Sequence, residues 1–477
     1  MIQSRHKEEA GTVSNPWLDC IRIELAGGVR VEHSGCKWCI LTGAKRISFN
    51  LPPGDTSTIL SEIQSGGVPL YKVAALQDRQ DGSLSLSEQI GRLWRGGLLV
   101  ESISHRNARI AVLHNPGEAP LIPAGVTPAD EITMTEEGCI RYEEQSLLME
   151  STASGSYVQI TSHELSWFPV PVTRAIRCAE WAQAAMLPQD VILALANWLA
   201  AIGVLRVNHS DQLVPRRPLG WSFADRMMYA RSRNGRHVGG YGGTYRRLEQ
   251  LPEPPAVQER WDGPVIPLLS PDIAEITKHD PPFTEVLEQR HSTREHGQSP
   301  LSLEKLGEFL YRTCRVTRHV VSQGKQIALR PYPSGGSCHE LEIYPLVNKC
   351  SGLDAGLYRY NGSTHSLFNI TRPESCTKDI LDYARLSCGM RGEPHVLLLI
   401  TARFLLVNYK YESLAYSLIL KNVGVLFQTM YLVATAMELG ACALGGGLSD
   451  AFCRAAKTDF WQENTVGEFM LGEMGAS

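Results

Sequence analysis

The chain has 477 residues, of which 43% are hydrophobic and 20% are charged, and its formal net charge at pH 7 is -4. This length exceeds what a single hydrophobic core usually supports, so two to four domains are expected. The near-neutral charge argues against general binding to nucleic acids or to anionic membranes.

The sequence contains little that would direct the chain to a membrane or out of the cell. The N-terminal segment MIQSRHKEEAGTVS lacks the apolar core of a signal peptide. The longest apolar stretches are too short, or too interrupted by charge, for a membrane span. The twelve cysteines have no close regular spacing, which is typical of reduced thiols. We therefore expect a soluble cytoplasmic protein.

The N-terminal part, residues 16–110, is expected to form a first module of short strands and helices. Apolar and polar residues alternate in segments bounded by glycine and proline, which predicts strands. Apolar residues then recur at helical spacing in two later segments. The predicted strands are 20–25, 28–33, 38–41 and 46–51, and the predicted helices are 56–64 and 85–99.

A second module is expected at residues 150–215. It contains a predicted strand (YVQIT), a helix (TRAIRCAEWAQAA), and a second helix over residues 190–202 that leads into a strand. The segments LSLSEQIGRLWRGGLLVESI and LPQDVILALANWLAAIGVLRVN each combine a tryptophan-bearing helix, a glycine and an apolar strand. We interpret the two modules as a duplicated winged-helix-like unit. The second helix carries no Lys or Arg, so DNA binding is not expected. A strand edge beside a helix can instead bind an extended peptide.

Residues 216–282 are predicted to be a linker that is rich first in Arg and Gly and then in Pro. Its first part predicts a helix over residues 223–231. The arginines could bind a phosphate or an acidic peptide, or could form a solvated helix face beside a loop. Upstream, Cys36 and Cys39 form a CxxC motif without a second ligand pair, so no metal site is predicted.

A basic turn opens the C-terminal part, residues 283–477. Arg290, Ser292 and Arg294 place two guanidinium groups and a hydroxyl on one short segment near a helix end. This set of donors suits a phosphate group. A second helix is predicted to begin at Ser302.

A tight turn follows at Pro333, Ser334, Gly335 and Gly336, before an alternating strand. Glycines and a hydroxyl let backbone donors face the edge of a planar polar ring, although an ordinary β-turn has the same composition. His339 has no clear catalytic partner, so we expect it to have a structural or substrate-contacting role. Residues 358–360 and 367–370 predict a hairpin.

The most informative stretch comes last. Residues 394–402 (PHVLLLITA) predict a strand in the middle of a sheet. A potential base and a potential acid, Lys410 and Tyr411, then precede an apolar run at residues 416–439. This run has almost no polar face and stops at Gly440, so we expect a helix that is buried on nearly all sides. After it come three consecutive glycines: Gly445, Gly446 and Gly447.

In this order, the motifs resemble the nitroreductase-like flavoproteins. The resemblance is specifically to the SagB-type dehydrogenases, which act as azoline oxidases in ribosomal-peptide pathways. It covers about residues 283–472 and is carried by the segments RHSTREHGQSPLSLEKLGEFL, RPYPSGGSCHELEIYPLV and NYKYESLAYSLILKNVGVLFQTMYL. The N-terminal half is similar to the longer cyanobactin-pathway oxidases. The expected architecture is therefore α+β, with a nitroreductase-like FMN fold preceded by two winged-helix-like peptide-binding modules.

The resemblance implies FMN as the cofactor and a homodimer with two flavin sites at its interface. Arg290, Ser292 and Arg294 would hold the FMN phosphate, and the turn at Pro333–Gly336, from the partner subunit, would lie along the flavin ring. Gly445, Gly446 and Gly447 would approach the reactive edge, and Gln428 is expected to face the cofactor. The helix would be covered partly by its own copy.

Two departures from the family pattern stand out. Where relatives commonly carry Gly-His, this chain has Gly424 and Val425. The C-terminal tail EFMLGEMGAS lacks the Lys or Arg that many nitroreductases add to the phosphate site, so Arg403 or Lys457 is the candidate to replace it.

Oxidation of a thiazoline or oxazoline to its azole removes a proton and a hydride from neighbouring carbons. FMN would accept the hydride, O2 would reoxidise it, and Lys410 or Tyr411 would remove the proton. Free Lys and Tyr have pKa values near 10, so the pKa of one of the two side chains must be lowered for it to act as a base near neutral pH. At a helix start both side chains can reach one site, and the sequence leaves open which of them is the base.

The predicted function is thus the oxidation of azolines in a modified precursor peptide. The expected partners are this peptide and a cyclodehydratase of the same pathway. Two alternatives stay open. One is an NAD(P)H-dependent nitroreductase or another peptide dehydrogenase. The other is a non-catalytic partner that presents peptide to a cyclodehydratase.

Overall fold

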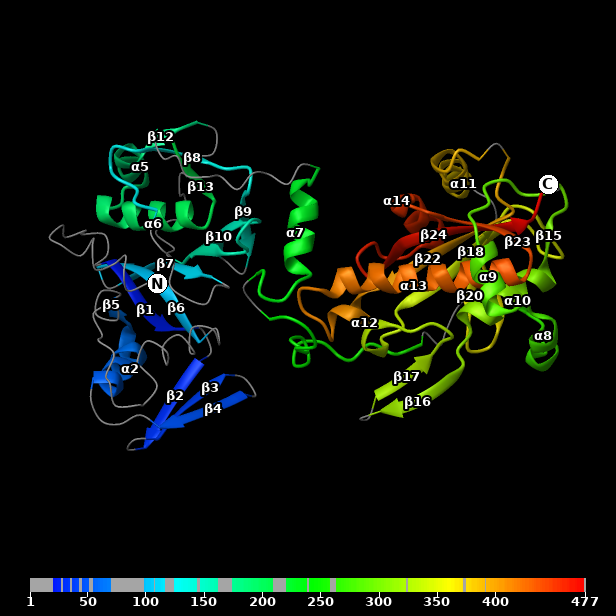
Figure 1. The fold of residues 1–477 in the computed structure, drawn as a ribbon, viewed down its shortest axis with the longest axis horizontal. Helices are drawn as coiled ribbons and strands as arrows, with labels where there is room; N and C mark the ends of the chain where they lie inside the picture. Colours follow the sequence, from blue (N-terminus) through cyan, green and yellow to red (C-terminus); the bar gives the residue numbers. More distant parts are fainter. Residues whose placement is uncertain are drawn as a thin grey trace. The chain divides into compact units, whose positions relative to one another are not determined.

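The computed structural model (Figure 1) describes most of the chain. The described ranges are 20–26, 29–34, 37–42, 45–50, 55–69, 98–106, 108–115, 124–143, 146–161, 174–208, 220–237, 240–257, 263–322, 325–371, 375–390 and 392–475. The chain divides into two compact units, residues 1–239 and 240–477. Each unit is described by itself.

The first unit is built on an antiparallel seven-stranded sheet. The predicted strands at CIRIEL and YVQIT are confirmed as β1 and β11, which pack into the core through alternate buried residues. The apolar strand predicted at the end of LSLSEQIGRLWRGGLLVESI is confirmed as β6 (Leu99–His105), whereas the sequence did not predict the strands between residues 108 and 151. In spatial order the sheet contains β5 (Val68–Pro69), β1 (Ile21–Leu25), β6 (Leu99–His105), β7 (Ala108–His114), β11 (Tyr157–Ile160), β10 (Ser146–Ser151) and β9 (Gly138–Glu143).

Two helices of the first unit cover part of this core. They are α5 (Cys178–Ala185) and α6 (Gln189–Ala201), which confirm the predicted helix pair. Trp181 and Trp198 are buried with Met149 and Val158 of the large sheet. A small sheet lies beside the helices, with the order β12 (Ile176–Arg177), β8 (Glu131–Met134) and β13 (Leu205–Val207).

The duplication of this unit stays a prediction. The predicted helix at 85–99 lies almost entirely outside the described residues. Cys36 of the CxxC motif also lies outside them. The early strands do form, as a separate antiparallel sheet of β2 (Val29–Ser34), β3 (Lys37–Thr42) and β4 (Lys45–Asn50), followed by α2 (Asp55–Gly66).

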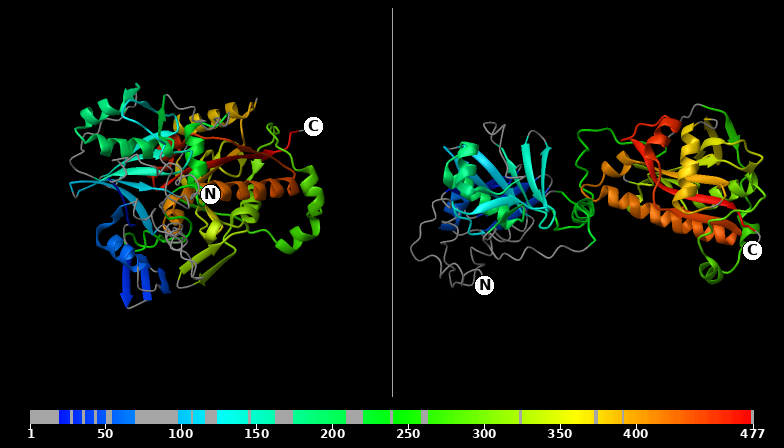
Figure 2. Two further views of the ribbon diagram at one scale, coloured as in Figure 1. Left: turned by 60° about the vertical axis from the view of Figure 1, so that its left-hand side comes forward. Right: turned by 90° about the horizontal axis from the view of Figure 1, so that it is seen from above.

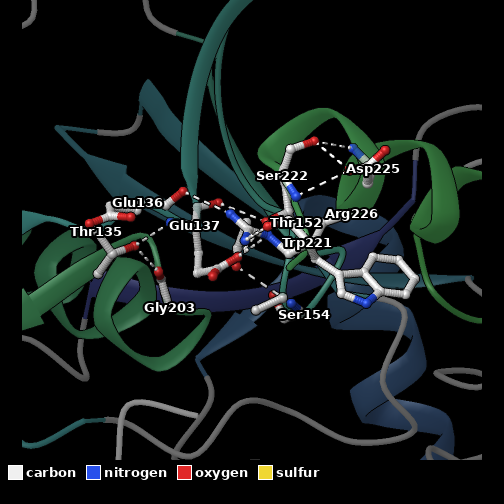
Figure 3. A network of polar contacts seen from close by, with 12 residues as sticks. Thr135, Glu136, Glu137, Thr152, Ser154, Gly203, Trp221, Ser222, Asp225 and Arg226 are labelled. Carbon is white, nitrogen blue, oxygen red and sulfur yellow. Dashed lines mark hydrogen bonds and ion pairs between the residues drawn. The ribbon is translucent and has the colours of Figure 1, made fainter. Parts of the chain in front are cut away.

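The predicted helix of the Arg-rich segment is confirmed as α7 (Phe223–Arg231). Ser222 and Asp225 form a capping box at its start. Arg226 then pairs with Glu137 at 3.0 Å, and Thr152 donates to the same carboxylate at 2.6 Å (Figure 3). Since these arginine contacts are made within the first unit, α7 is a packed element of that unit.

The second unit contains an antiparallel seven-stranded sheet with helices on both faces (Figure 2). The predicted central strand is confirmed as β22, which is buried along nearly its whole length between β18 and β24. The predicted hairpin is β20 and β21. In spatial order the strands are β14 (Val265–Pro267), β21 (Ser366–Thr371), β20 (Gly356–Asn361), β18 (Leu341–Val347), β22 (Val396–Arg403), β24 (Glu463–Glu473) and β23 (Leu439–Leu444).

The two faces of this sheet have separate cores. Leu306, Phe309 and Phe469 belong to the core that includes α10 and α13, whereas Phe452 and Met470 belong to the core under α11 and α14. Ser302 caps α10 by accepting a hydrogen bond from the Lys305 amide at 3.2 Å, as predicted. The helices are α8 (Ile273–His279), α9 (Phe283–Gln289), α10 (Leu303–Cys314), α11 (Ser375–Ser387), α12 (Phe404–Asn408), α13 (Ala415–Ala436) and α14 (Ser449–Ala456).

Helix α13 is the longest element of the second unit, with 22 residues. The prediction that it is buried on nearly all sides is wrong for a single chain. Lys421, Gly424, Val425 and Gln428 lie on an exposed stripe, and the Val425 side chain is 37% exposed. The opposite side packs into the core through residues such as Leu426.

The end of α13 also differs from the prediction. The helix ends at Ala436, and it is Glu438, with a φ of 53°, that reverses the chain. Gly440 lies inside β23, where an added Cβ would come within 3.3 Å of both Thr293 and His296. This glycine therefore permits the close approach of the basic segment and does not end the helix.

Among the described residues, α13 alone is a single helix long and apolar enough to cross a membrane, and α5 with α6 passes the same test only as a pair bent by 118°. Core helices of globular units meet this test too. In α13 the buried residues contact the sheet and α10.

Candidate functional site

Lys410 and Tyr411 lie in the short turn between α12 and α13, and both side chains reach the same glycine. The Lys410 ammonium (Nζ) donates to the Gly336 carbonyl at 3.0 Å. A Cβ added to Gly336 would lie 2.2 Å from the Tyr411 hydroxyl, and this residue has a φ of +62°. A side chain at position 336 would therefore be strained and would displace Tyr411. The structure thus brings the predicted base–acid pair onto the predicted turn.

The Ser334–Gly336 turn is fixed by Asn422 on the buried side of α13. The Asn422 carbonyl accepts from the Gly335 amide at 3.0 Å, and its amide donates to Ser334 at 3.1 Å and to Glu340 at 2.8 Å. Ser334 donates to the second Glu340 oxygen at 3.2 Å. This closed network gives the turn one conformation before any ligand binds.

One titratable group, Glu340, belongs to this network, and a second, His339, adjoins it. Burial raises the pKa of the Glu340 carboxyl, and its hydrogen bond from Asn422 partly opposes the rise. Burial, with the nearby Arg330 charge, lowers the pKa of His339 to about 4, so this imidazole is neutral at physiological pH. Asn422 and Glu340 were missed by sequence reasoning, although an amide side chain in a largely apolar helix could have signalled a buried partner.

The basic segment gathers on a different residue of α13. Ser292 lies 2.9 Å from the Tyr431 hydroxyl, and the Arg290 guanidinium lies 5.3 Å from the centre of the Tyr431 ring. The same hydroxyl accepts from the Ala443 amide at 2.8 Å. Tyr431, which the sequence gave no reason to select, thus joins the basic segment to β23.

Within the described residues, neither Arg290 nor Arg294 forms an ion pair. Ser292 and Arg294 are exposed, and Arg290 is half-buried. Two guanidinium groups without carboxylate partners, beside a hydroxyl, are a donor set that fits a phosphate.

These two clusters contact opposite faces of α13. Tyr431 follows Asn422 by nine residues, which corresponds to about 13 Å along the helix axis and about half a turn around it. The turn cluster around Gly336 and the basic segment of one chain therefore face away from each other across the same helix.

The glycine loop lies at the end of β23, on the side of the basic segment. Adding a Cβ to Gly445 would meet no atom within 4 Å, whereas at Gly447 it would lie 1.8 Å from a Glu468 carboxylate oxygen. Glu468 is buried, and this burial raises its pKa to about 7. Gln428 is exposed on α13 and Pro333 is exposed before the turn.

Arg403 lies far from the basic segment that it was expected to complete. It donates to the Pro255 carbonyl at 2.7 Å and lies 3.8 Å from Glu342. The Thr293 amide of the basic segment instead donates to the Ala441 carbonyl. Ala441 and Val396 both pair with Leu471 of β24, so they lie at the same height across the sheet. Val396 and Arg403 are seven residues apart on β22, which is about 23 Å. Arg403 therefore anchors the proline-rich segment, and Lys457 is an exposed residue at the end of α14.

Comparison with known proteins identifies the second unit. The model of the Nitroreductase family matches residues 287–473. A protein from Methanocaldococcus jannaschii described as a nitroreductase is 30% identical over 183 residues, covering 38% of this chain and 85% of its own length. The chain therefore belongs to the nitroreductase family, whose members are flavin-dependent oxidoreductases.

Solved structures are also similar to part of the chain. A protein from Ralstonia eutropha JMP134 described as a nitroreductase has 23% identity and a TM-score of 0.36, and the match covers 48% of this chain and all of that one. A chain of the Escherichia coli microcin synthetase McbBCD complex with truncated pro-MccB17 has 20% identity and a TM-score of 0.34, covering 39% and 70%.

Proposed function

We propose that the protein is an FMN-dependent oxidase that converts thiazoline or oxazoline rings in a ribosomally made peptide into thiazoles or oxazoles. The observation that carries this proposal is the convergence of Lys410 and Tyr411 on Gly336. A flavin oxidoreductase that takes a hydride from carbon also needs a base for the neighbouring proton, and this pair supplies one.

The residues present fit FMN. Arg290, Ser292 and Arg294 would hold the phosphate, because their donors have no carboxylate partner among the described residues. The rigid Ser334–Gly336 turn and the loop at Gly445 would flank the ring, since both offer backbone with little side-chain bulk. When bound, FMN supplies the hydride acceptor and passes the electrons to O2.

We propose further that the working form is a homodimer. The turn cluster and the basic segment lie on opposite faces of α13, so one chain cannot bring both to one ligand. A second copy would place its turn cluster against the basic segment of the first. The exposed stripe with Gly424 and Val425 is the part of α13 that this copy would cover.

The chain's own residues then handle the proton. The Gly336 carbonyl orients the Lys410 ammonium, and the absence of a side chain at Gly336 leaves room for the Tyr411 hydroxyl. The neutral Lys410 amine or the Tyr411 phenolate can accept the proton from the azoline carbon, and the other group can stabilise the charge that results. Azole formation removes this proton together with a hydride, so each ring loses two hydrogens.

The rest of the proposal concerns the setting of the reaction. The first unit would bind the precursor peptide, a cyclodehydratase of the same pathway would form the azoline, and the reaction would take place in the cytoplasm. The family match also favours a second candidate, an NAD(P)H-dependent nitroreductase.

Three measurements on the purified protein test the proposal. A yellow protein with flavin absorption bands is expected, and a colourless protein that cannot be loaded with FMN would leave only a peptide-presenting role. Incubation with an azoline-containing peptide and O2 should lower the peptide mass by about two mass units per ring. Rapid NAD(P)H-driven reduction of a nitroaromatic compound, with no change in the peptide, would instead establish the second candidate.

A further inference from the structure

Residues 240–247, here called the strap, are bound along the turn that carries Lys410 and Tyr411. The Glu412 amide donates to the Gly242 carbonyl at 3.0 Å, and the Tyr245 amide donates to the Lys410 carbonyl at 3.2 Å. The Ser413 hydroxyl donates to the Gly240 carbonyl at 2.9 Å. The strap therefore contacts the turn mainly through its backbone, as an added strand does.

The strap also holds the carboxylate of Glu412. Thr244 donates to one of its oxygens at 3.0 Å, and Arg246 donates to the other at 3.2 Å. The carboxylate is packed so closely against Gly240 that a Cβ there would lie 2.0 Å from an oxygen. Hydroxyl, guanidinium and glycine backbone thus fix the direction in which Glu412 points.

Lys410 is two residues from Glu412 in the same turn, close enough along the chain for an ion pair between the two side chains. Within the described residues, Lys410 forms no ion pair, and its ammonium lies 3.0 Å from the Gly336 carbonyl and 6.0 Å from the centre of the Tyr245 ring. The titratable or charged groups on the elements that pack around it are Tyr241, Tyr245, Arg246 and Arg247 of the strap, Tyr409, Tyr411 and Glu412 of its own turn, and His339 and Glu340 beyond Gly336.

We propose that Thr244 and Arg246 are positioning residues, which hold Glu412 away from Lys410 so that the lysine keeps no carboxylate partner. An adjacent carboxylate would stabilise the protonated amine, and a protonated amine cannot accept the substrate's proton. The strap thereby deepens the proposed function, on which this role rests, by keeping Lys410, one of the two candidate bases of that site, available to accept a proton.

The experiment compares Arg246→Ala in two backgrounds, wild type and Glu412→Gln, in the full-length protein. Only the neutral amine reacts with acetic anhydride, so the labelling rate of Lys410, measured by peptide mass spectrometry against exposed Lys457, reports its neutral fraction. In the wild-type background Arg246→Ala should slow this labelling about threefold, the change that half a pH unit produces. In the Glu412→Gln background the same substitution should have no effect.

Three variants control the result. Arg247→Ala removes the neighbouring strap arginine, which has no side-chain contact with Glu412 among the described residues, and should leave labelling unchanged. Arg246→Lys should restore part of the rate, since it retains the charge. Thr244→Val tests the same idea with little loss of volume if Arg246→Ala proves unstable on heating. Equal slowing in both backgrounds, or no slowing by either strap variant, would overturn the proposal.

Labelling does not depend on turnover, so the two proposals fail separately. A protein that labels as expected but leaves azoline peptides unchanged would refute the proposed reaction and keep the strap's role. If the peptide is oxidised, the pH of half-maximal turnover should rise in Arg246→Ala and return in the double variant. Oxidation with an unchanged pH profile would refute the strap's role alone.

Discussion

The two ends of α13 present opposite designs. At its N-terminal end, Asn422, Glu340 and Ser334 satisfy one another's hydrogen bonds, and Lys410 is tied to Gly336. At its C-terminal end, Tyr431 orders Ser292 and Arg290, but the guanidinium groups of the basic segment have no carboxylate partner among the described residues. The polar groups at the N-terminal end, here called the closed end, are thus satisfied within the chain. The guanidinium groups at the C-terminal end, here called the open end, remain available to a ligand.

This difference indicates a division of labour. Proton transfer requires atoms held within a few tenths of an ångström, so its residues are fixed in advance by a closed network. A phosphate site, which is the role proposed for the basic segment, requires charge that is not already neutralised, and among the described residues Arg290 and Arg294 have no carboxylate partner. Because the two ends also lie on opposite faces of α13, the proposed reaction combines the closed end of one chain with the open end of another.

The largest effect is expected at the closed end. Lys410→Ala or Tyr411→Phe should lower azole formation by about 10²- to 10⁴-fold, the usual contribution of a positioned acid or base. Neither change touches the basic segment, so the flavin content should be unchanged. Turnover and the flavin spectrum are measured on the same preparation. Normal turnover in both variants would remove the catalytic assignment.

A heterodimer tests whether the two ends come from different chains. One tagged chain carries Lys410→Ala and the other carries Arg290→Ala with Arg294→Ala, and tandem purification isolates the mixed dimer. One of its sites would contain all the substitutions and the other none, so about half of the wild-type turnover should return. Sites built from one chain each would give no recovery, which would contradict the composite arrangement.

The open end should show a smaller effect, confined to cofactor binding. Each charge-assisted hydrogen bond contributes about 1.5–3 kcal/mol, so Arg294→Ala should weaken FMN binding by about 10- to 100-fold. Arg318→Ala, at an exposed position on β16 (Arg318–Ser322), serves as the matched control. Fluorescence titration of the FMN-free protein measures both affinities. Equal affinities for the two variants would mean that the phosphate lies elsewhere.

The fold of the second unit could largely be predicted from the sequence. Strand β22 and the β20–β21 hairpin follow from continuous or bounded apolar runs, and the start of α10 from its serine cap. The strands of the first unit between residues 108 and 151 were missed, because buried and exposed residues do not alternate regularly along them. Periodicity is least informative for such strands.

The site was predictable only in part. The motif residues could be named because glycine, hydroxyl and charge are rare in that combination. Asn422, Tyr431 and Glu412 could not, since each acts through a partner that is distant in the sequence, such as Gly335, Ser292 or Thr244. Burial of α13 was overestimated because apolar composition does not show which side of a helix a second chain would cover.

The smallest effect concerns Glu468, a buried carboxylate at the open end. Glu468 is buried against Gly447, and its pKa is raised from 4.5 to about 7 by that burial. Between these two values the folded protein binds more protons than the unfolded chain does, so this residue makes folding less favourable as the pH rises through that range. Above about pH 7 the free energy by which Glu468 destabilises the folded protein no longer changes with pH.

Glu468→Gln, which stays neutral, should therefore stabilise the protein relative to wild type at pH 8 by on the order of 1–3 kcal/mol, and much less at pH 5. Urea unfolding at both values measures the difference, with the exposed Glu438→Gln as control. An equal effect at pH 5 and pH 8 would mean that Glu468 is ionised in the folded protein, and the glycine loop would then carry a fixed negative charge where the proposal places the flavin.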